Sequence, residues 1–464
     1  MQVSHMARAV SGSFDDPNLV SVAGLVPVMK LAEKAGLRAL AQRWLSVPTD
    51  KGANAGLKVA SLVGGMVAGA DSIDDMALLR HGGMRKLFNA CYAPSTLGSF
   101  LRSFTFGHVR QLDAVASRFL GNLTEHTPLL VNDNDNGYVF LDVDDTIIEV
   151  HGYQKQGSGY GYSGVRGLNA LLATLKTSSS APIVVAQRLR RGACGSPRGA
   201  GKLTSDALAT IKRLRGTNTA RILARFDSAF YGYATINAAI KAGAAVSVTA
   251  RMDPAIKRAI GTIPDGGWEA IEYTDAIYDE TSKTWISNAE VAEIAFTAFT
   301  SRKKSEHIIG RLVVRRIPEL NKKAGADQPT LFDTHRFHAF FTTSDLDTVT
   351  ADKTHRGHAI IEQVNADLKG SALAHLPSGV FTANAAWLTL AAMAFNLTRA
   401  AATVAGTGLA KATTATIRRK LISIPARIAT SARRISLHLP MDWPWKTGWT
   451  VLFDRAGPPI ATTT

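Results

Sequence analysis

Cysteine is scarce in this sequence. Cys91 and Cys194 are the only two among 464 residues, and no CxxC pair occurs. Two cysteines cannot build a disulfide framework, and without a CxxC pair a cysteine-based zinc site is not expected. The composition is therefore typical of a protein of a reducing cytoplasm.

Long apolar runs are also scarce. The opening segment, MQVSHMARAVSGSFDDPN, lacks the apolar core of a signal peptide. One stretch, 370–398, contains no Asp, Glu, Lys or Arg, but Pro377, Gly379, Asn384 and Asn396 interrupt it. We therefore expect a buried helix in this stretch rather than a membrane span, and we expect no membrane partner.

Acidic residues are outnumbered. The chain has 53 Lys+Arg against 37 Asp+Glu, and its net charge of +16 predicts a polyanionic partner such as nucleic acid. The excess is largest over 186–221 and over 399–464. Glycines in the first of these segments allow its backbone to approach a phosphate closely. Our candidate DNA-binding residues there are Arg188, Arg190, Arg191, Arg198 and Lys202.

The length of the chain predicts two to four domains. Strand-like runs alternate with helix-like runs after residue 138, which indicates an α/β domain. A Pro-Ser-Thr start, a helix, a short break and a second helix within 93–120 are typical of a helix-turn-helix, and equally of a small helical bundle. The segments that we expect are a helical N-terminal DNA-binding domain (1–130), the first part of an α/β core (131–250), a β-rich insertion (251–335), the second part of the core (336–400) and a basic, helical C-terminal region (401–464).

Three carboxylates lie close together in the strand-like run YVFLDVDDTIIEV, residues 138–150. Because side chains alternate along a strand, Asp142 and Asp144 share one face, whereas Asp145 lies on the other. Carboxylates that hold two divalent cations about 3.5–4 Å apart are the usual site of phosphodiester chemistry. The alternative is an acidic strand end that leads into a turn.

A further acid follows another apolar run, ARILARF. Asp227 precedes a Ser and a helix, so it is also a candidate N-cap. If its strand lies beside the first one, Asp227 joins the other acids at the carboxyl edge of the same sheet, where functional sites collect.

A polar stripe is predicted on the helix HRGHAIIEQVNADLK. At about 100° per residue, His355, His358, Glu362 and Lys369 fall within a stripe of about 60°. An acid, two imidazoles and an ammonium on one face can bind a metal and a phosphate together. The alternative is an ordinary solvated face.

Together, these three segments resemble the DDE transposases of bacterial insertion sequences, in particular the subgroup with a Tyr-Arg-Glu-Lys helix signature. The signature positions i, i+3, i+7 and i+14 are held here by His355, His358, Glu362 and Lys369. Glu and Lys match, whereas the two histidines depart from the pattern, so the phosphate contact of the usual Arg would fall to His358 or to Arg356. The blocks LDVDDTIIEVHGYQKQGSGYGYSGVRGLNALLATL and RFDSAFY also resemble the family, and the resemblance spans about residues 20–455.

The resemblance implies an RNase H-like catalytic core. Its metal ligands would be Asp144, Asp227 and Glu362, with Asp142 as the second choice for the first position and Asp145 as the third. It also implies two Mg²⁺ ions, for which Mn²⁺ is the expected substitute. A flipped base would stack on an aromatic residue of the insertion, and the candidates are Trp268 and Trp285.

The function implied is cut-and-paste DNA transposition, with hydrolysis of one strand followed by strand transfer from the freed 3′-hydroxyl. The partners would be double-stranded DNA, both the terminal inverted repeats of the element and the target, and a second copy of the chain in a homodimeric complex. The protein would be a bacterial cytoplasmic endonuclease that associates with the nucleoid when it binds DNA.

Two other functions stay open. FLDVDDT also fits the nucleophile motif of haloacid-dehalogenase-type phosphatases, in which Asp142 would attack phosphorus and Asp144 would act as acid and base. The second acid of that family's last motif is missing, since Phe230 and Tyr231 occupy the region after Asp227. The remaining alternative is a catalytically inactive DNA-binding protein.

Overall fold

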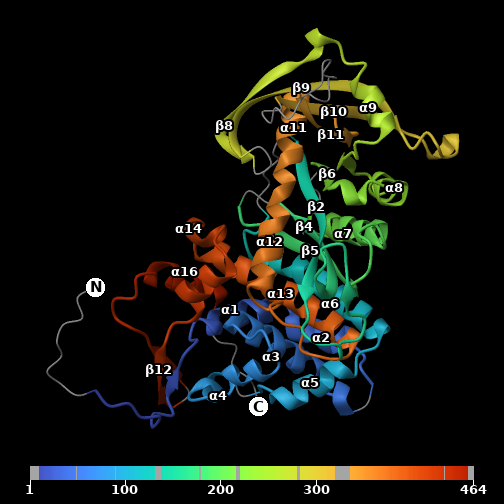
Figure 1. Ribbon diagram of the computed structural model, residues 1–464. Coiled ribbons are helices and arrows are strands. Elements are labelled where there is room, and N and C mark those ends of the chain that lie inside the picture. The colour runs from blue at the N-terminus through green and yellow to red at the C-terminus, as the bar shows by residue number, and fades with distance from the viewer. Residues whose placement is uncertain are drawn as a thin grey trace.

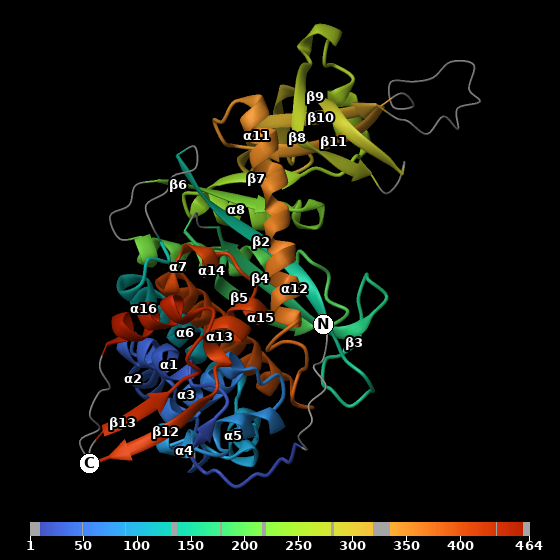
Figure 2. The same cartoon turned by 90° about the vertical axis from the view of Figure 1, so that its left-hand side faces the viewer.

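The computed structural model describes residues 10–48, 50–88, 90–130, 137–176, 179–215, 220–279, 283–318, 335–432 and 434–457. A long mixed sheet stands on a base of helices, and antiparallel strands extend the sheet at its far end (Figure 1). An interrupted helix, labelled α11 and α12, runs along the sheet from these added strands to the helical base (Figures 1 and 2). The expected α/β class is confirmed.

Five strands form the centre of the sheet, in the spatial order β5-β4-β2-β6-β7. They are β2 (Tyr138–Glu149), β4 (Arg166–Leu175), β5 (Ile183–Arg191), β6 (Arg221–Phe226) and β7 (Ala245–Thr249). β4 is antiparallel to both β2 and β5, whereas β6 is parallel to β2 and to β7. The apolar runs of the sequence therefore mark these strands correctly. Helices α7 (Ala200–Arg215) and α8 (Tyr233–Lys241) make the crossover connections that parallel neighbours require.

The strands between 251 and 342 continue the same sheet. β11 (His335–Thr342) pairs antiparallel with β7, and β10 (Ile308–Pro318), β9 (Thr284–Ala298) and β8 (Glu269–Asp279) follow in that order. Together with α9 (Pro254–Ile260), they enclose a small apolar cluster of their own. The predicted insertion is thus β-rich, but it is joined to the central sheet edge to edge through β11.

The N-terminal helices share one apolar core with the sheet. A continuous cluster of buried side chains runs from Val20 through Leu172 of the sheet to Leu452 near the C-terminus. The longest N-terminal helix, α6 (Phe106–His126), contacts α13, α7 and β5, and no residue of it from His108 to Thr124 is exposed. Because a recognition helix must present a free face to DNA, the structure favours the helical-bundle interpretation of this segment over a helix-turn-helix.

Helix α13 (Phe381–Ala405) is the buried helix expected from the charge-free stretch. It is long and apolar enough to cross a membrane by length and composition, but 94% of its most apolar window is buried inside the protein. Asn384 bonds the backbone of Ser378, and Asn396 bonds both backbone groups of Val184. The polar residues that interrupt the stretch therefore have partners inside the fold.

The C-terminal region is not wholly helical, contrary to expectation. β12 (Ala426–Ser431) and β13 (Arg434–His438) form a hairpin, and β12 pairs with β1 (Leu19–Val20) near the other end of the chain. In β13, Ile435 and Leu437 alternate with Ser436 and His438, so a short strand signal was present in the sequence and was missed. The remaining helices and short elements are α1 (Leu25–Lys34), α2 (Leu37–Trp44), η1 (Asp50–Gly52), α3 (Ala55–Ala68), η2 (Asp74–Leu79), α4 (Met84–Leu87), α5 (Pro94–Arg102), β3 (Gly159–Tyr160), η3 (Ser228–Phe230), η4 (Asp265–Gly267), η5 (Lys304–Glu306), α14 (Thr407–Ala410), α15 (Thr414–Ile417), the π-helix η7 (Arg418–Ile422) and α16 (Lys446–Ala456).

We expect Asn396→Leu to lower the free energy of unfolding by about 2–5 kcal/mol, since it leaves two buried backbone groups of the outer strand β5 without a partner. In the native protein the side chain of Asn396 accepts from the Val184 N–H at 2.9 Å and donates to its carbonyl at 2.7 Å. Denaturant unfolding measures the loss. The control is Thr398→Val, since the Thr398 hydroxyl bonds only a carbonyl of its own helix, and an equal loss in both variants would contradict the assignment.

Candidate active site

Asp142 is a buried structural carboxylate. It has no exposed surface, and Arg225 of the neighbouring strand donates to both of its oxygens at 2.7 Å. His358 lies 2.9 Å from the same carboxylate through Nδ1. Burial opposes ionisation of Asp142, but the Arg225 guanidinium outweighs it and holds the pKa below its usual value.

These contacts decide against two roles considered for Asp142. Both oxygens are already engaged, so they are not free to bind a metal as a second-choice ligand. A carboxylate without exposed surface also cannot attack the phosphorus of a substrate, as a haloacid-dehalogenase-type phosphatase would require. Asp142 therefore holds the structure together at this point.

Asp144 lies two residues further along β2, on the same face. Its Oδ2 accepts from Asn365 Nδ2 at 2.9 Å. Partial burial, together with the negative charges of Asp227 and Asp145, raises the pKa of Asp144 to about 6. A carboxylate in this state is one that a cation would stabilise in its ionised form.

Asp227 follows β6 and lies next to Asp144. The β2–β6 register pairs Val143 with Phe226, and its next step brings Asp144 beside Asp227. Asp227 also caps η3 by accepting from the Ala229 N–H at 3.0 Å, as its sequence context suggested. Partial burial raises the pKa of Asp227 above its usual value. The two acids thus form a partly desolvated carboxylate pair at the carboxyl edge of the sheet.

The predicted helix over 355–369 is broken. α11 (Thr348–Arg356) passes into a 3₁₀ turn, η6 (Gly357–Ala359), before α12 (Ile360–Lys369) begins. Arg225 donates to the Thr354 carbonyl at 2.5 Å near this break. A Cβ atom at Gly357 would lie only 2.8 Å from Nη1 of Arg225. The single stripe deduced from uniform helical spacing is therefore incorrect, because the turn rotates its first half relative to its second.

Both histidines of the stripe face the sheet. His355 lies between the hydroxyls of Ser247 and Thr249, at 2.8 and 2.9 Å, and stacks on Phe340 with a ring separation of 4.2 Å. Burial places the pKa of His355 well below its usual value, so the ring is neutral. His358 is held against Asp142 through Nδ1, so both histidines have partners inside the fold, and a contact of His358 with DNA stays a prediction. The third candidate on this segment, Arg356, donates to Asp352 of its own helix.

Glu362, Asn365 and Lys369 belong to α12, the second half of the broken helix. Glu362 and Lys369 are exposed, and Asn365 is buried. Asn365 lies one turn after Glu362 and reaches Asp144, so the helix carries Glu362 toward the carboxylate pair. The Oδ1 of Asn365 is buried and has no hydrogen-bond partner among the residues that the structure describes. Sequence analysis missed Asn365, although its position at i+3 from Glu362 was a usable signal.

Asp145 points to the opposite face and is bound to a second arginine. Arg190, which is 7% exposed, forms an ion pair with Asp145 and donates to Asn169 and to the carbonyls of Ser196 and Arg198. Arg190 thus anchors the loop that follows β5, and it is not available to DNA. Of the three aspartates on β2, only Asp144 has no arginine partner in the described part of the chain.

Two of the other basic candidates have an acidic partner, and Lys202 is exposed as well as paired. Arg188 and Lys202 both bind Asp206, at 3.3 and 2.6 Å. Arg191, the last residue of β5, and Arg198, in the segment that follows, are exposed. This pair remains our main candidate for contacts with the DNA backbone.

The aromatic candidates of the insertion are only partly placed. Arg316 stacks over the ring of Trp268 at 4.2 Å, and Phe337 packs beside that ring. One face of Trp268 is therefore already occupied. Trp285 lies on β9, and its side chain is outside the described residues.

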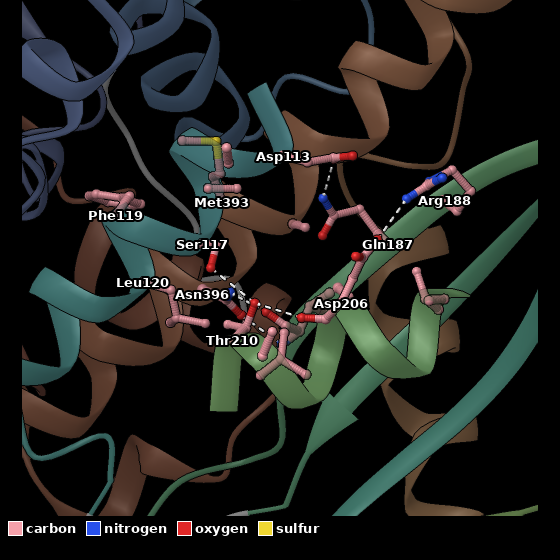
Figure 3. Close-up of a pocket in the computed structure, with 18 of the residues that line it drawn as sticks. Asp113, Ser117, Phe119, Leu120, Gln187, Arg188, Asp206, Thr210, Met393 and Asn396 are labelled. Atoms are coloured by element: carbon pink, nitrogen blue, oxygen red, sulfur yellow. Dashed lines mark hydrogen bonds and ion pairs between the residues drawn. The ribbon is translucent and has the colours of Figure 1, made fainter. Parts of the chain in front are cut away.

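A separate small cavity of about 170 Å³ lies between α6, β5, α7 and α13 (Figure 3). The acids on its wall are occupied: Asp113 binds Gln187 and Thr389, and Asp206 binds Arg110 and Arg188. None of the carboxylates at the edge of the sheet lines it. The cavity belongs to the packing of α6 against the core and is not the active site.

Comparison with known protein families shows to which family the chain belongs. The family model described as "Transposase DDE domain group 1" matches residues 3–456 of the chain. The protein belongs to the DDE transposases. No curated protein matches the chain. The transposase assignment rests on nearly the whole chain, so the phosphatase and the inactive DNA-binding protein are not favoured.

DDE transposases are metal-dependent nucleases and strand transferases that act on DNA, and they generally use divalent metal ions. The donors at the carboxyl edge of this transposase fit such an ion by their chemistry. Asp144 and Asp227 supply hard carboxylate oxygens, and the unpartnered Oδ1 of Asn365 supplies another. No group of three or more His, Cys, Asp or Glu side chains in the described ranges is already gathered as a metal site.

We expect Arg225→Met to lower the free energy of unfolding of the transposase by about 3–5 kcal/mol, because it leaves Asp142 buried without its cation. The measurement is urea unfolding. The matched control is Arg221→Met on the same strand, whose ion pair with Asp345 is more than half exposed and therefore contributes little to stability. A loss no larger than that of the control would show that the Asp142–Arg225 pair is not structural.

Proposed function

We propose that this transposase carries out cut-and-paste transposition with Asp144, Asp227 and Glu362 as the ligands of two Mg²⁺ ions, for which Mn²⁺ substitutes. The observation that carries the proposal is the carboxylate pair at the edge of β2 and β6, with α12 held beside it. Asp144 is bonded from Asn365 of α12, and its raised pKa reflects burial next to Asp227.

The topology supports an RNase H-like core. Three strands joined antiparallel, followed by two strands parallel to the first, give the order 3-2-1-4-5 when the central strands are numbered along the chain. In such a sheet, the first and fourth strands are neighbours, and their carboxyl ends bring Asp144 and Asp227 together. Glu362 comes from the helix that follows the insertion.

In this proposal each residue of the site has a distinct role. When bound, the metal ions activate a water for attack on the scissile phosphate and stabilise the departing oxygen. Asp144 and Asp227 hold their oxygens at the edge of the sheet, and Glu362 approaches from α12. Asn365 orients Asp144 through its amide. Arg225 keeps α11, η6 and the sheet in register, so that Glu362 and Asn365 stay in place.

The substrate proposed is double-stranded DNA that carries the terminal inverted repeats of the element, with target DNA as the acceptor. Exposed Arg191 and Arg198 would contact the phosphate backbone beside the acids, and Lys369 would contact it from α12. A homodimer that holds two element ends is the assembly that cut-and-paste transposition requires. The place of action is the cytoplasm, on the nucleoid.

Asp144→Asn, Asp227→Asn and Glu362→Gln are each expected to reduce Mg²⁺-dependent nicking of element ends to the level seen in EDTA. Each variant loses one charged ligand but keeps nearly the same shape, so DNA binding should persist. Gel analysis of labelled ends measures nicking, and a mobility shift without divalent cation measures binding. The matched control is Glu125→Gln, an exposed acid near the end of α6 that the proposal does not place at the site. Full nicking by any of the three variants would remove that residue from the ligand set.

Lys369→Ala is expected to weaken binding to element ends and to reduce the slope of log affinity against log salt by about one unit, as the loss of one phosphate contact should. Lys369 lies two turns after Glu362, about 10.5 Å along the helix axis. Sequence preference should not change, because phosphate contacts do not specify bases. Titrations at several salt concentrations test this.

The matched control is Lys241→Ala. Lys241 is also exposed and is also the last residue of its helix, α8. If both lysines only satisfy a helix C-terminus, each variant loses a little stability and neither changes the salt slope. A slope for Lys369→Ala equal to that of the wild type would leave Lys369 as a helix cap.

A further inference from the structure

A groove of about 800 Å³ starts at Asp145, the residue after Asp144, and runs along the end of β2. We call it the tyrosine groove. Its floor is 145–149, one wall is 160–163, the other wall is 192–196, and Lys369 of α12 lies at its side. In Figure 2 the segment around β3, which carries the first wall, stands out from the sheet next to α12.

We propose that the tyrosine groove binds an unpaired stretch of DNA, with bases stacked on Tyr160 and Tyr162 and a phosphate bound to Lys369. The location of this site beside the cleavage centre rests on the proposed function. The binding itself depends only on the groove.

The rings of the two tyrosines extend into solvent. Tyr160 is 60% exposed and Tyr162 is fully exposed, although tyrosine loses stabilisation when its ring stays in water. Tyr153 of the same loop differs, because Arg166 stacks on its ring at 4.0 Å. Tyr160 lies further from that guanidinium, at 5.9 Å. Exposed rings beside a groove are the stacking platforms that unpaired bases use.

The wall that carries the tyrosines is anchored to the core. The Gln156 N–H donates to the Gly379 carbonyl at 2.9 Å, and its side chain accepts from the Phe381 N–H at 3.1 Å. Lys155 donates to the Leu376 carbonyl at 2.5 Å. The rings are therefore presented by a fixed loop, so less conformational entropy is lost when a base binds.

The opposite wall is fixed by a close approach of backbones. The Gly192 N–H donates to the Gly157 carbonyl at 2.9 Å, and a Cβ at Gly192 would lie 2.1 Å from the Gly167 oxygen. Only glycine fits there. Arg190 then bonds the carbonyls of Ser196 and Arg198 at 2.8 and 2.7 Å. Both walls are thus held in place in the free protein.

The chemistry of the groove favours an unpaired strand over a duplex. A base inside a duplex offers only its edges to a protein, whereas an unpaired base offers its face to an aromatic ring. Asp145 on the floor is already neutralised by Arg190, so it does not repel a phosphate. Lys369, which is exposed, supplies positive charge at the side of the groove.

The test compares a blunt duplex with the same duplex carrying a short oligothymidine tail, using the full chain without divalent cation. We expect the wild type to bind the tailed duplex more tightly. Tyr160→Ala and Tyr162→Ala should each lower the affinity for the tailed duplex about tenfold, the typical effect of losing one stacked base, and should leave the blunt duplex unchanged. Tyr160→Phe and Tyr162→Phe should bind like the wild type, because the ring remains.

Tyr278→Ala is the matched control, since Tyr278 is an exposed tyrosine of β8 outside the groove. A wild type without preference for the tail, or Ala variants that keep it, would overturn the proposal. The result is independent of the ligand assignment, because no metal is present. If the two Ala variants lose the tail preference, the groove proposal is supported. If the nicking predictions fail, only the assignment of the metal ligands is affected.

A second measurement uses the unmutated protein. Cys194 lines the groove, whereas Cys91 lies elsewhere, and burial raises the pKa of the Cys91 thiol to about 11. The tailed duplex should slow alkylation of Cys194 by iodoacetamide more than the blunt duplex does, while Cys91 reacts little in any state. Equal alkylation of Cys194 with both duplexes would also overturn the proposal.

Discussion

The buried ion pair between Asp142 and Arg225 is the contact on which the active site of this transposase depends. It joins two adjacent parallel strands, and the same guanidinium reaches the Thr354 carbonyl of the helix that crosses them. His358 adds a second bond from the helix side. Since burying charges is costly, such a pair persists only where bonds on every side replace the lost water. Here those bonds fix the position of α12 over the edge of the sheet.

The three aspartates of β2 are divided between structure and chemistry by the same principle. Asp142 and Asp145 each have a buried arginine, on opposite faces of the strand. Asp144 lies between them, bonded by an amide and close to Asp227, and its pKa is raised to about 6. Two aspartates of this strand are therefore used in ion pairs that stabilise the fold around the candidate site. The third, Asp144, is left available to bind a cation.

The rest of the chain is organised around this centre. The N-terminal helices, the central sheet, α13 and the C-terminal elements share one apolar core, so they support the site together rather than as separate modules. The added strands have an apolar cluster of their own and extend the sheet away from the helical base (Figure 1). This arrangement leaves the carboxyl edge of β2 and β6, the exposed arginines after β5 and the loop around β3 on the surface where DNA can approach.

The sequence alone determined the central strands, the buried helix α13, the presence of a β-rich segment after β7 and the resemblance to DDE transposases. The alternation of apolar residues and the order of acidic motifs are properties of the sequence, and they can be recognised without knowing which residues are in contact. Only the tertiary structure decided which of these acids is free. Asp142, Asp144 and Asp145 are the same residue type, but an arginine binds Asp142 and Asp145 and none binds Asp144 in the described part of the chain. It also decided that Arg190, His355 and His358 turn inward, that Asn365 bonds Asp144, and that the stripe on the helix is broken at Gly357. Each of these outcomes depends on residues that lie far apart in the chain, and helical or strand periodicity carries no information about such pairs.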